Sequence, residues 1–490
     1  MGVIKRQGIK NTIATYIGFV IGFLNLIVIQ PHFLTKEELG LTRILYSFSL
    51  LIAMFVPLGI GNATVRFFPQ FKDLDKRHHG YFGFMMLFPL FGFVLTVLVI
   101  WLFKDLIVSQ YIKESPLFTE FFNYVFPMIF FVSFIAILNI YCFSNFKSTI
   151  PTYLNDIGVR LLTIAVVSLY YLKFLNLDQF IQAFTGIYGI QLILLVGYIF
   201  IFDRPGFKID WPFFREMKFM KLISFGFLLW FASVASIGLK YFDSVMIGKY
   251  MPLGFVGIYT VAAFIPTIIE APLNAFEKIA ASKIAFAWAE NNMKEIREIY
   301  EKSSLYMFLL GGFLFLNVNI NIHDLFSFLP DGYQAGESIV LILSVGTIFN
   351  MATGLNAPIL FNSDKYKTGA VFLISLAIVV VFMQTVFIPR YGMNGAALAT
   401  CLASLFYNSL LFGYVLKHFK LQPFDAKNLK VAALIIVLYF IGMILPDLDN
   451  KVVNIAYHSF VISVSYLGAV YLLNIIPDFH HLLPWKKSKQ

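Results

Sequence analysis

Long apolar stretches alternate with short polar segments along almost the whole chain. About fourteen such stretches can be marked, each near the ~20 residues that an α-helix needs to cross ~30 Å of hydrocarbon. This pattern predicts an all-α, polytopic membrane protein of about fourteen transmembrane helices. The predicted spans are 11–30, 42–64, 82–103, 121–143, 155–175, 180–202, 220–240, 250–272, 303–322, 337–360, 367–388, 393–416, 430–446 and 453–476.

The positions of the basic residues predict how these helices are oriented. Of the 37 Lys and Arg residues, roughly 27 fall in the N-terminus, the even-numbered loops and the C-terminus, and roughly nine in the odd-numbered loops. Cytoplasmic loops carry such an excess, so both termini are predicted to be cytoplasmic. The retained first helix follows a basic start, MGVIKR, without a convincing cleavage site.

Composition supports this reading and narrows the possible functions. The chain is 59% hydrophobic and 13% charged, with a mean hydropathy of +0.78, so lipid must be the solvent for most of its surface. The net charge of +10 is explained by cytoplasmic loops that face anionic headgroups, and nucleic acid is not an expected partner. Cys142 and Cys401 lie in apolar runs without metal-ligand spacing, so neither a metal nor a cofactor is expected.

The loops are too short for a soluble catalytic domain. None exceeds about thirty residues, and no GxxxxGK[ST] phosphate loop is present, which excludes an ATP-driven pump within this chain. The longest cytoplasmic connection, residues 274–302, has mixed charge and is predicted to be an interfacial helix. In the first span, Gly18 and Gly22 form a GxxxG pattern that favours close helix packing.

A weak internal repeat suggests the domain organisation. Placing Gly40 over Gly257 aligns IQPHFLTKEELGLTRILYSF with IGKYMPLGFVGIYTVAAF, and six spans separate the two copies. The alignment predicts two six-helix lobes in parallel repeat, residues 1–205 and 206–420, followed by two additional helices and a basic tail in residues 421–490.

Three segments carry a family resemblance. FLTKEELGLTRI, GIGNATVRFFPQF and IPRYGMNGAALAT resemble the polysaccharide (O-antigen type) flippase branch of the multidrug/oligosaccharidyl-lipid/polysaccharide exporter superfamily. The resemblance implies two lobes around a cavity that opens to one side of the membrane at a time. It also implies a cargo, an oligosaccharide on a polyprenyl pyrophosphate, turned from the inner to the outer leaflet of the bacterial inner membrane. The polysaccharide assembly machinery is a further candidate partner.

Charged residues near the predicted cytoplasmic side are the first candidates to meet this cargo. Arg160 lies inside the fifth span, where an ionisable group is a functional candidate, and a guanidinium suits bidentate contact with phosphate. Alternatively, Asp156, one turn away, pairs with Arg160 to neutralise it. Arg66 ends the second span, either as a first contact for the headgroup or as an interfacial anchor.

Other candidates lie in later spans and in the first span. Lys240 and Asp243 mark the outer end of the seventh span, as a release site or as a mutual ion pair. Glu270, followed by Pro272, is an acid that could exchange a proton during transport, or a hydrogen-bonded carboxyl near the inner interface. Asn25 and Gln30 are expected to bind sugar hydroxyls or to join helices.

Two other classes of function stay open. A drug or small-molecule cation antiporter of the same fold requires a compact acidic pocket, which one intramembrane Arg and few acids disfavour. A membrane polymerase or ligase acting on lipid-linked glycans requires an acceptor site on a sizeable outer loop, and the longest outer loop has about seventeen residues. The sequence therefore favours a transporter over an enzyme.

Overall fold

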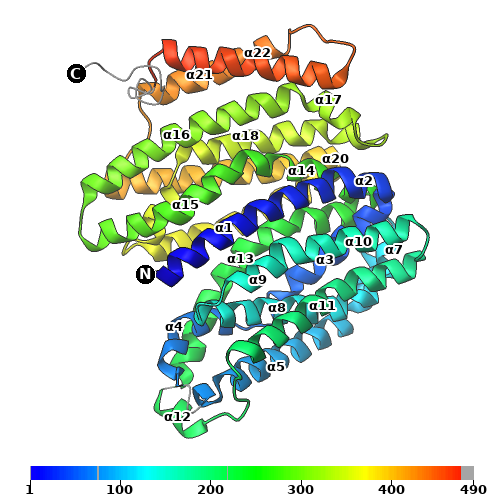
Figure 1. Ribbon diagram of the computed structural model, residues 1–490, viewed down its shortest axis with the longest axis vertical. Helices are drawn as coiled ribbons and strands as arrows, with labels where there is room; N and C mark the ends of the chain where they lie inside the picture. Colours follow the sequence, from blue (N-terminus) through cyan, green and yellow to red (C-terminus); the bar gives the residue numbers. More distant parts are fainter. Residues whose placement is uncertain (1, 74–76, 218, 476–490) are drawn as a thin grey trace. The chain divides into compact units, whose positions relative to one another are not determined.

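The computed structural model describes residues 2–73, 77–217 and 219–475, and these form helices without a strand. The contacts divide the chain into two compact units, unit 1 (Met1–Thr260) and unit 2 (Val261–Gln490). Figure 1 shows that each unit consists of long helices packed side by side. The fold class predicted from the sequence, all-α and polytopic, is confirmed. The predicted lobe boundaries, which come from the repeat, remain predictions.

Unit 1 contains the shorter and more interrupted helices. Its first long helix passes through a π-helical turn, η1, and a second π-helical turn, η4, precedes α10. The elements are α1 (Gly2–Phe23), η1 (Leu24–Ile29), α2 (Gln30–Phe33), α3 (Lys36–Ala53), α4 (Ile60–Phe71), η2 (Arg77–Gly80), α5 (Tyr81–Leu102), α6 (Lys104–Ser109), α7 (Pro116–Glu120), η3 (Phe122–Tyr124), α8 (Val125–Ser144), α9 (Thr149–Tyr153), η4 (Leu154–Gly158), α10 (Val159–Tyr171), α11 (Leu177–Phe202), α12 (Trp211–Glu216) and α13 (Phe219–Tyr250).

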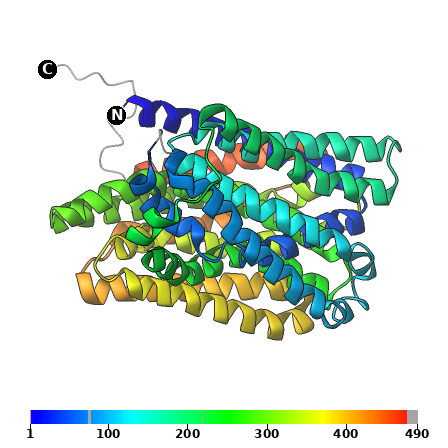
Figure 2. The ribbon, with the colours of Figure 1, turned by 90° about the horizontal axis from the view of Figure 1, so that it is seen from below.

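The boundary between the units falls within α14 (Gly254–Phe264), and unit 2 continues from there. Its elements are α15 (Pro266–Ala289), α16 (Met293–Ile320), α17 (Ile322–Ser327), η5 (Tyr333–Gly336), α18 (Glu337–Thr353), α19 (Asn356–Phe361), α20 (Tyr366–Phe419), α21 (Ala426–Gly442) and α22 (Lys451–Leu472). Helix α20 is two helices, because Gly392 has φ 59° and the chain folds back there. The Thr368 hydroxyl consequently reaches the Tyr414 hydroxyl at 3.3 Å, and Figure 2 shows two neighbouring rods in yellow and orange.

The lengths and hydropathies of the observed helices do not confirm the predicted total of about fourteen membrane spans. Within the described residues, nine helices are long and apolar enough to cross a membrane, or ten if the bent pair α14 and α15 counts as one span. The predicted second span, 42–64, is broken between α3 and α4, where Gly59 has φ 85°. Helix α21 has only 17 residues, and α20 counts once although it contains two predicted spans.

The two glycines aligned by the repeat lie close together in unit 1. A Cβ atom on Gly257 would lie 2.5 Å from the Lys36 carbonyl oxygen and 3.3 Å from the Gly40 nitrogen, and a Cβ on Gly40 would collide with the Leu253 carbonyl. The starts of α3 and α14 therefore touch through backbone.

Candidate functional site

Arg160 is packed against α1. Its guanidinium donates a hydrogen bond to the Gly18 carbonyl, and a Cβ atom on Gly22 would overlap the same guanidinium. The Thr15 hydroxyl donates to the Asp156 carboxylate at 2.8 Å. The GxxxG pattern allows the predicted close packing of α1, because a Cβ atom on Gly18 would lie 2.5 Å from the Asp156 carbonyl oxygen, whereas Gly22 leaves room for the Arg160 side chain.

The predicted ion pair between Asp156 and Arg160 has no direct contact. Both side chains turn toward α1, and no ion pair joins them in the described part of the chain. The two groups are still near enough for the charge of Asp156 to act on the guanidinium. Arg160 is half-buried, so this arrangement satisfies a membrane-embedded cation through a backbone carbonyl and a nearby carboxylate.

Arg43 on α3 is a second embedded cation, which the sequence analysis did not single out. Its guanidinium donates to the Gln30 side chain, and the Gln30 amide donates to Asn25 at 3.1 Å. Gln30 and Asn25 are 2% and 6% exposed, so neither reaches open solvent. The two predicted amides therefore lie together, as a chain that supports a guanidinium.

The sequence contains Arg43 within a recognised segment, but the predicted start of its helix puts Arg43 too close to the helix end. Arg43 is part of the segment FLTKEELGLTRI, yet a span starting at residue 42 puts it at the membrane interface. The helix begins earlier, at Lys36, because Thr35 and Glu38 form a capping box. An earlier start by six residues moves Arg43 about 9 Å deeper along the helix.

Arg66 and the predicted pair at the outer end of the seventh span have different environments. Arg66 is exposed on α4, with its guanidinium 4.4 Å from the Phe225 ring centre, a cation–π contact. The Asp243 carboxylate accepts a hydrogen bond from the Tyr259 hydroxyl. Lys240 lies on α13, but its side chain is outside the described residues, so the predicted Lys240–Asp243 pair stays a prediction.

In unit 2, the candidate acid has an amide partner and an acidic neighbour. The Asn350 amide of α18 donates to the Glu270 carboxylate at 3.1 Å. Glu277, two turns further along α15, is half-buried and close enough for the charges of the two carboxylates to act on each other. Glu277 does not stand out in the sequence, because the mixed charge around it predicts an interfacial helix.

A histidine–aspartate cluster joins two loops of unit 1 on the side predicted to be cytoplasmic. His78 Nε2 lies 2.9 Å from an Asp203 carboxylate oxygen, and the Tyr141 hydroxyl donates to the other oxygen. His79 Nδ1 lies 2.9 Å from Asp210. Burial alone raises the pKa of Asp203, but hydrogen bonds from His78 and Tyr141 and nearby positive charge outweigh it and lower the pKa below 3.8. The cluster fastens the start of α5 to the end of α11.

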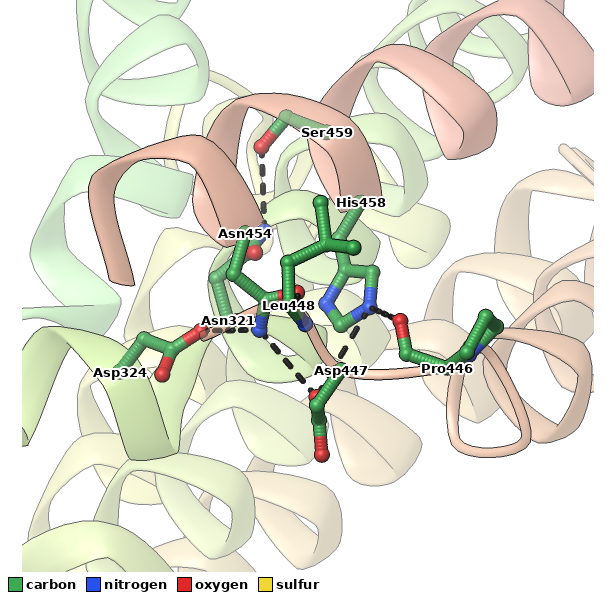
Figure 3. A network of polar contacts seen from close by, with 8 residues as sticks. All are labelled: Asn321, Asp324, Pro446, Asp447, Leu448, Asn454, His458 and Ser459. Atoms are coloured by element: carbon green, nitrogen blue, oxygen red, sulfur yellow. Dashed lines mark hydrogen bonds and ion pairs between the residues drawn. The ribbon is translucent and has the colours of Figure 1, made fainter. Parts of the chain in front are cut away.

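Unit 2 has a polar network on the side predicted to face outward. Figure 3 shows the Asn454 amide between two carboxylates, donating to Asp324 at 2.7 Å and to Asp447 at 3.1 Å. His458 Nε2 lies 3.9 Å from Asp447 and 3.4 Å from the Pro446 carbonyl. The network ties α22 to α17, so it anchors one of the two additional helices to the rest of unit 2. No group of three or more His, Cys, Asp or Glu side chains suited to a metal occurs among the described residues.

Comparisons with known proteins identify relatives and the fold. The profile of the family described as "Polysaccharide biosynthesis protein" matches residues 4–281, more than half of the chain. The "Uncharacterized membrane protein MJ1068" of Methanocaldococcus jannaschii is 22% identical over 483 residues, covering 91% of this chain and 90% of that protein.

Two solved structures share the fold at low identity. A lipid II flippase, MurJ, in an inward closed conformation, has a TM-score of 0.73 at 16% identity and covers 96% of this chain and 100% of its own. An inward-facing multidrug resistance MATE family transporter of the MOP superfamily has a TM-score of 0.65 at 13% identity, covering 85% and 95%. The fold is therefore that of membrane flippases and transporters of this superfamily.

Proposed function

The chain belongs to the polysaccharide biosynthesis protein family, and from this premise we propose that it is a flippase for a polyprenyl-pyrophosphate-linked oligosaccharide. The cargo moves from the inner to the outer leaflet of the plasma membrane by alternating access, for polysaccharide or O-antigen assembly. Both termini lie in the cytoplasm, and the assembly machinery receives the product. No chemical bond changes, so the protein acts as a transporter.

The embedded cation Arg43 is the observation that carries this proposal. A pyrophosphate cannot enter hydrocarbon unaided, because removing its water costs far more than contacts of the lipid tail return. A guanidinium contacts two phosphate oxygens at once. The chain Arg43–Gln30–Asn25 holds such a group in a fixed orientation in the interior of unit 1.

Other basic residues extend the proposed route. Arg66, which is exposed on α4, receives the headgroup at the cytoplasmic surface. Arg160 lies across α1 and is free to meet the pyrophosphate only after that contact opens, which links cargo binding to movement of α1. Lys240 and Asp243 stand at the release side. The Asp156 carboxylate accepts a hydrogen bond from Thr15, and its negative charge partly offsets the positive charge of Arg160.

Glu270 is the proposed coupling residue in unit 2. Its hydrogen bond from Asn350 and the nearby Glu277 place two carboxylates on one face of α15. If a cation or a proton binds these two carboxylates more tightly in one of the inward-open and outward-open conformations, its binding shifts the equilibrium toward that conformation. The same acidic face supports the second candidate function, cation antiport, in which the pair binds the exported cation.

The leaflet that holds lipid-linked glycans tests the proposed function. Cells that lack the protein are expected to accumulate the intermediate on the cytoplasmic face, and re-expression is expected to relieve the accumulation. Arg160→Ala should abolish this rescue at an unchanged protein level, whereas Gly197→Ala, where an added Cβ meets nothing within 4 Å, should rescue fully. Normal outer-face delivery without the protein would overturn the proposal and favour cation antiport.

A further inference from the structure

Three tyrosine rings from three different helices meet in the interior of unit 1. Tyr46 of α3 stacks on Tyr188 of α11 with ring centres 5.3 Å apart and an interplanar angle of 20°. Tyr241 of α13 meets the edge of Tyr46 with ring centres 5.9 Å apart. All three side chains keep part of their surface accessible. We call Tyr46, Tyr188 and Tyr241 the tyrosine cluster.

The cluster lies near the middle of the membrane. Tyr46 is ten residues from the start of α3 and Tyr188 is eleven from the start of α11, which corresponds to about 15–17 Å along each helix. Both helices begin on the side predicted to be outer, and the hydrocarbon is about 30 Å thick. The charge of Arg43, one helical turn before Tyr46, acts on Tyr46 and Tyr188.

Packing alone does not account for three tyrosines at this depth. Hydroxyl groups are costly to bury in an apolar environment, and phenylalanine fills the same space without that cost. The chain uses 57 Phe and 25 Tyr. Other buried tyrosines of unit 1 use their hydroxyls to join segments of the chain. Tyr111, which packs on Phe48 and Phe118, donates to the Val245 carbonyl at 3.4 Å, and Tyr141 donates to the Asp203 carboxylate. Polar groups at membrane depth are therefore candidates for function.

We propose that the tyrosine cluster binds a sugar ring of the cargo, beside the anion held by Arg43. A pyranose ring has an apolar C–H face that fits an aromatic ring and hydroxyls that pair with phenol and amide groups. Arg43 disfavours a cationic aromatic ligand at the same place by charge repulsion. This inference rests on the proposed flippase function and adds the part of the substrate that unit 1 recognises.

The test separates sugar binding from anion binding with two soluble probes. The probes are the free oligosaccharide, released by mild acid from lipid-linked glycans of cells lacking the protein, and inorganic pyrophosphate. Tyr46→Leu and Tyr188→Leu are expected to weaken oligosaccharide binding by roughly 3- to 10-fold each, while pyrophosphate affinity stays unchanged. Tyr46→Phe should give an oligosaccharide affinity between those of the unaltered protein and Tyr46→Leu, because the ring face remains but the hydroxyl is lost.

A matched control comes from another stacked pair in unit 1. Tyr171 stacks on Phe33 with ring centres 4.3 Å apart, but it lies at the end of α10 and is 53% exposed. Tyr171→Leu should leave oligosaccharide affinity unchanged. Unchanged affinity in both cluster variants, an equal loss in Tyr171→Leu, or a parallel loss of pyrophosphate binding would each overturn the sugar assignment.

A measurement on the unaltered protein covers the case in which a leucine variant fails to fold. In a saturation-transfer NMR experiment, saturation of the protein's aromatic protons should transfer to the ring protons of the bound oligosaccharide. Absence of this transfer would overturn the proposal. Failure of the flippase function has a different signature, since cells lacking the protein would then accumulate no glycan on the cytoplasmic face. Accumulation without aromatic contact would therefore reject the sugar site alone.

Discussion

Unit 1 and unit 2 are both built from long apolar helices, yet the charged groups that define their candidate sites differ in sign. Unit 1 holds Arg43 on an amide chain and Arg160 on a backbone carbonyl, whereas unit 2 holds Glu270 beside Glu277. Unit 1 also has two interior acids, Asp156 and Asp243, and each accepts a hydrogen bond from a hydroxyl.

On the proposed function, this contrast corresponds to different roles for the two units. An embedded cation attracts an anionic headgroup, and an embedded acid attracts a proton or a metal cation. Fold alone would not reveal the difference, since function depends on the side chains placed on the fold. Substitutions that remove either charge therefore test the comparison directly.

Among the substitutions that follow, removal of the Arg43 charge should have the largest effect. Arg43→Ala removes the cation that is proposed to bind the pyrophosphate, and loss of one partner from a desolvated charge pair costs about 2–5 kcal/mol of binding, so glycan export should fall by at least about 30-fold. Arg66→Ala, which removes an exposed cation, should reduce export by less than about 5-fold. The rate of glycan appearance in the outer leaflet, at matched protein level, measures both. Equal effects would refute the special role of the embedded cation.

Neutralising the acids of unit 2 should change coupling and leave cargo binding intact. Glu270→Gln keeps an oxygen for the Asn350 amide but removes the charge, so dependence of transport on a proton or cation gradient should disappear. Glu277→Gln should weaken that dependence by less. Transport by reconstituted vesicles with and without a gradient is the measurement, and oligosaccharide affinity serves as the control. Gradient dependence that survives in both variants would remove these acids as the coupling site.

An added methyl group on α1 at Gly22 should test whether the Arg160 guanidinium packs against this helix. In Gly22→Ala, the new methyl group would overlap the guanidinium, and overpacking costs about 1–3 kcal/mol. The melting temperature should fall by roughly 2–10 °C, and export should fall with it. Gly197→Ala on α11, with nothing within 4 Å of the added carbon, should be neutral or stabilising by about 0.5–1 kcal/mol. A neutral Gly22→Ala would show that Arg160 does not lie across α1.

Of the two histidine–aspartate contacts, the exposed one at Asp447 is expected to show the smallest effect of all. Asp203, whose side chain is 5% exposed, should contribute more stability than Asp447, which is 86% exposed beside His458. Asp203→Asn should destabilise unit 1 at pH 7 by about 1.5–3 kcal/mol, and Asp447→Asn by less than about 1 kcal/mol. Because the pKa of Asp203 is lowered on folding, its contribution is full above pH 3.8 and is lost as the pH falls further. Melting temperatures of the unaltered protein and of both variants at pH 7 and at pH 3 check this direction. A stability difference between the unaltered protein and Asp203→Asn that is larger at pH 3 than at pH 7 would contradict it.

Some residues of the candidate site could be found from the sequence, because their position inside a predicted membrane span is enough to single them out. Arg160 and Glu270 stand inside apolar runs, and an ionisable residue there is recognisable without a structure. Arg43 was missed because the capping box at Thr35 and Glu38 starts α3 before the apolar run begins. Glu277 was missed because residues around it have mixed charge, although α15 continues from Pro266 to Ala289 without interruption.

The sequence by itself determined that this is a multi-pass helical membrane protein related to polysaccharide flippases. Apolar run length and family segments are local properties, so neither depends on which helices become neighbours. Tertiary structure alone decided the partners of each polar group, since Gly18 and Arg160, or Gln30 and Arg43, meet only when distant helices pack. Spans that are apolar on nearly all sides carry little information about which face turns inward, and this is the physical reason that the tyrosine cluster and the opposite charges of the two units became visible only in the fold.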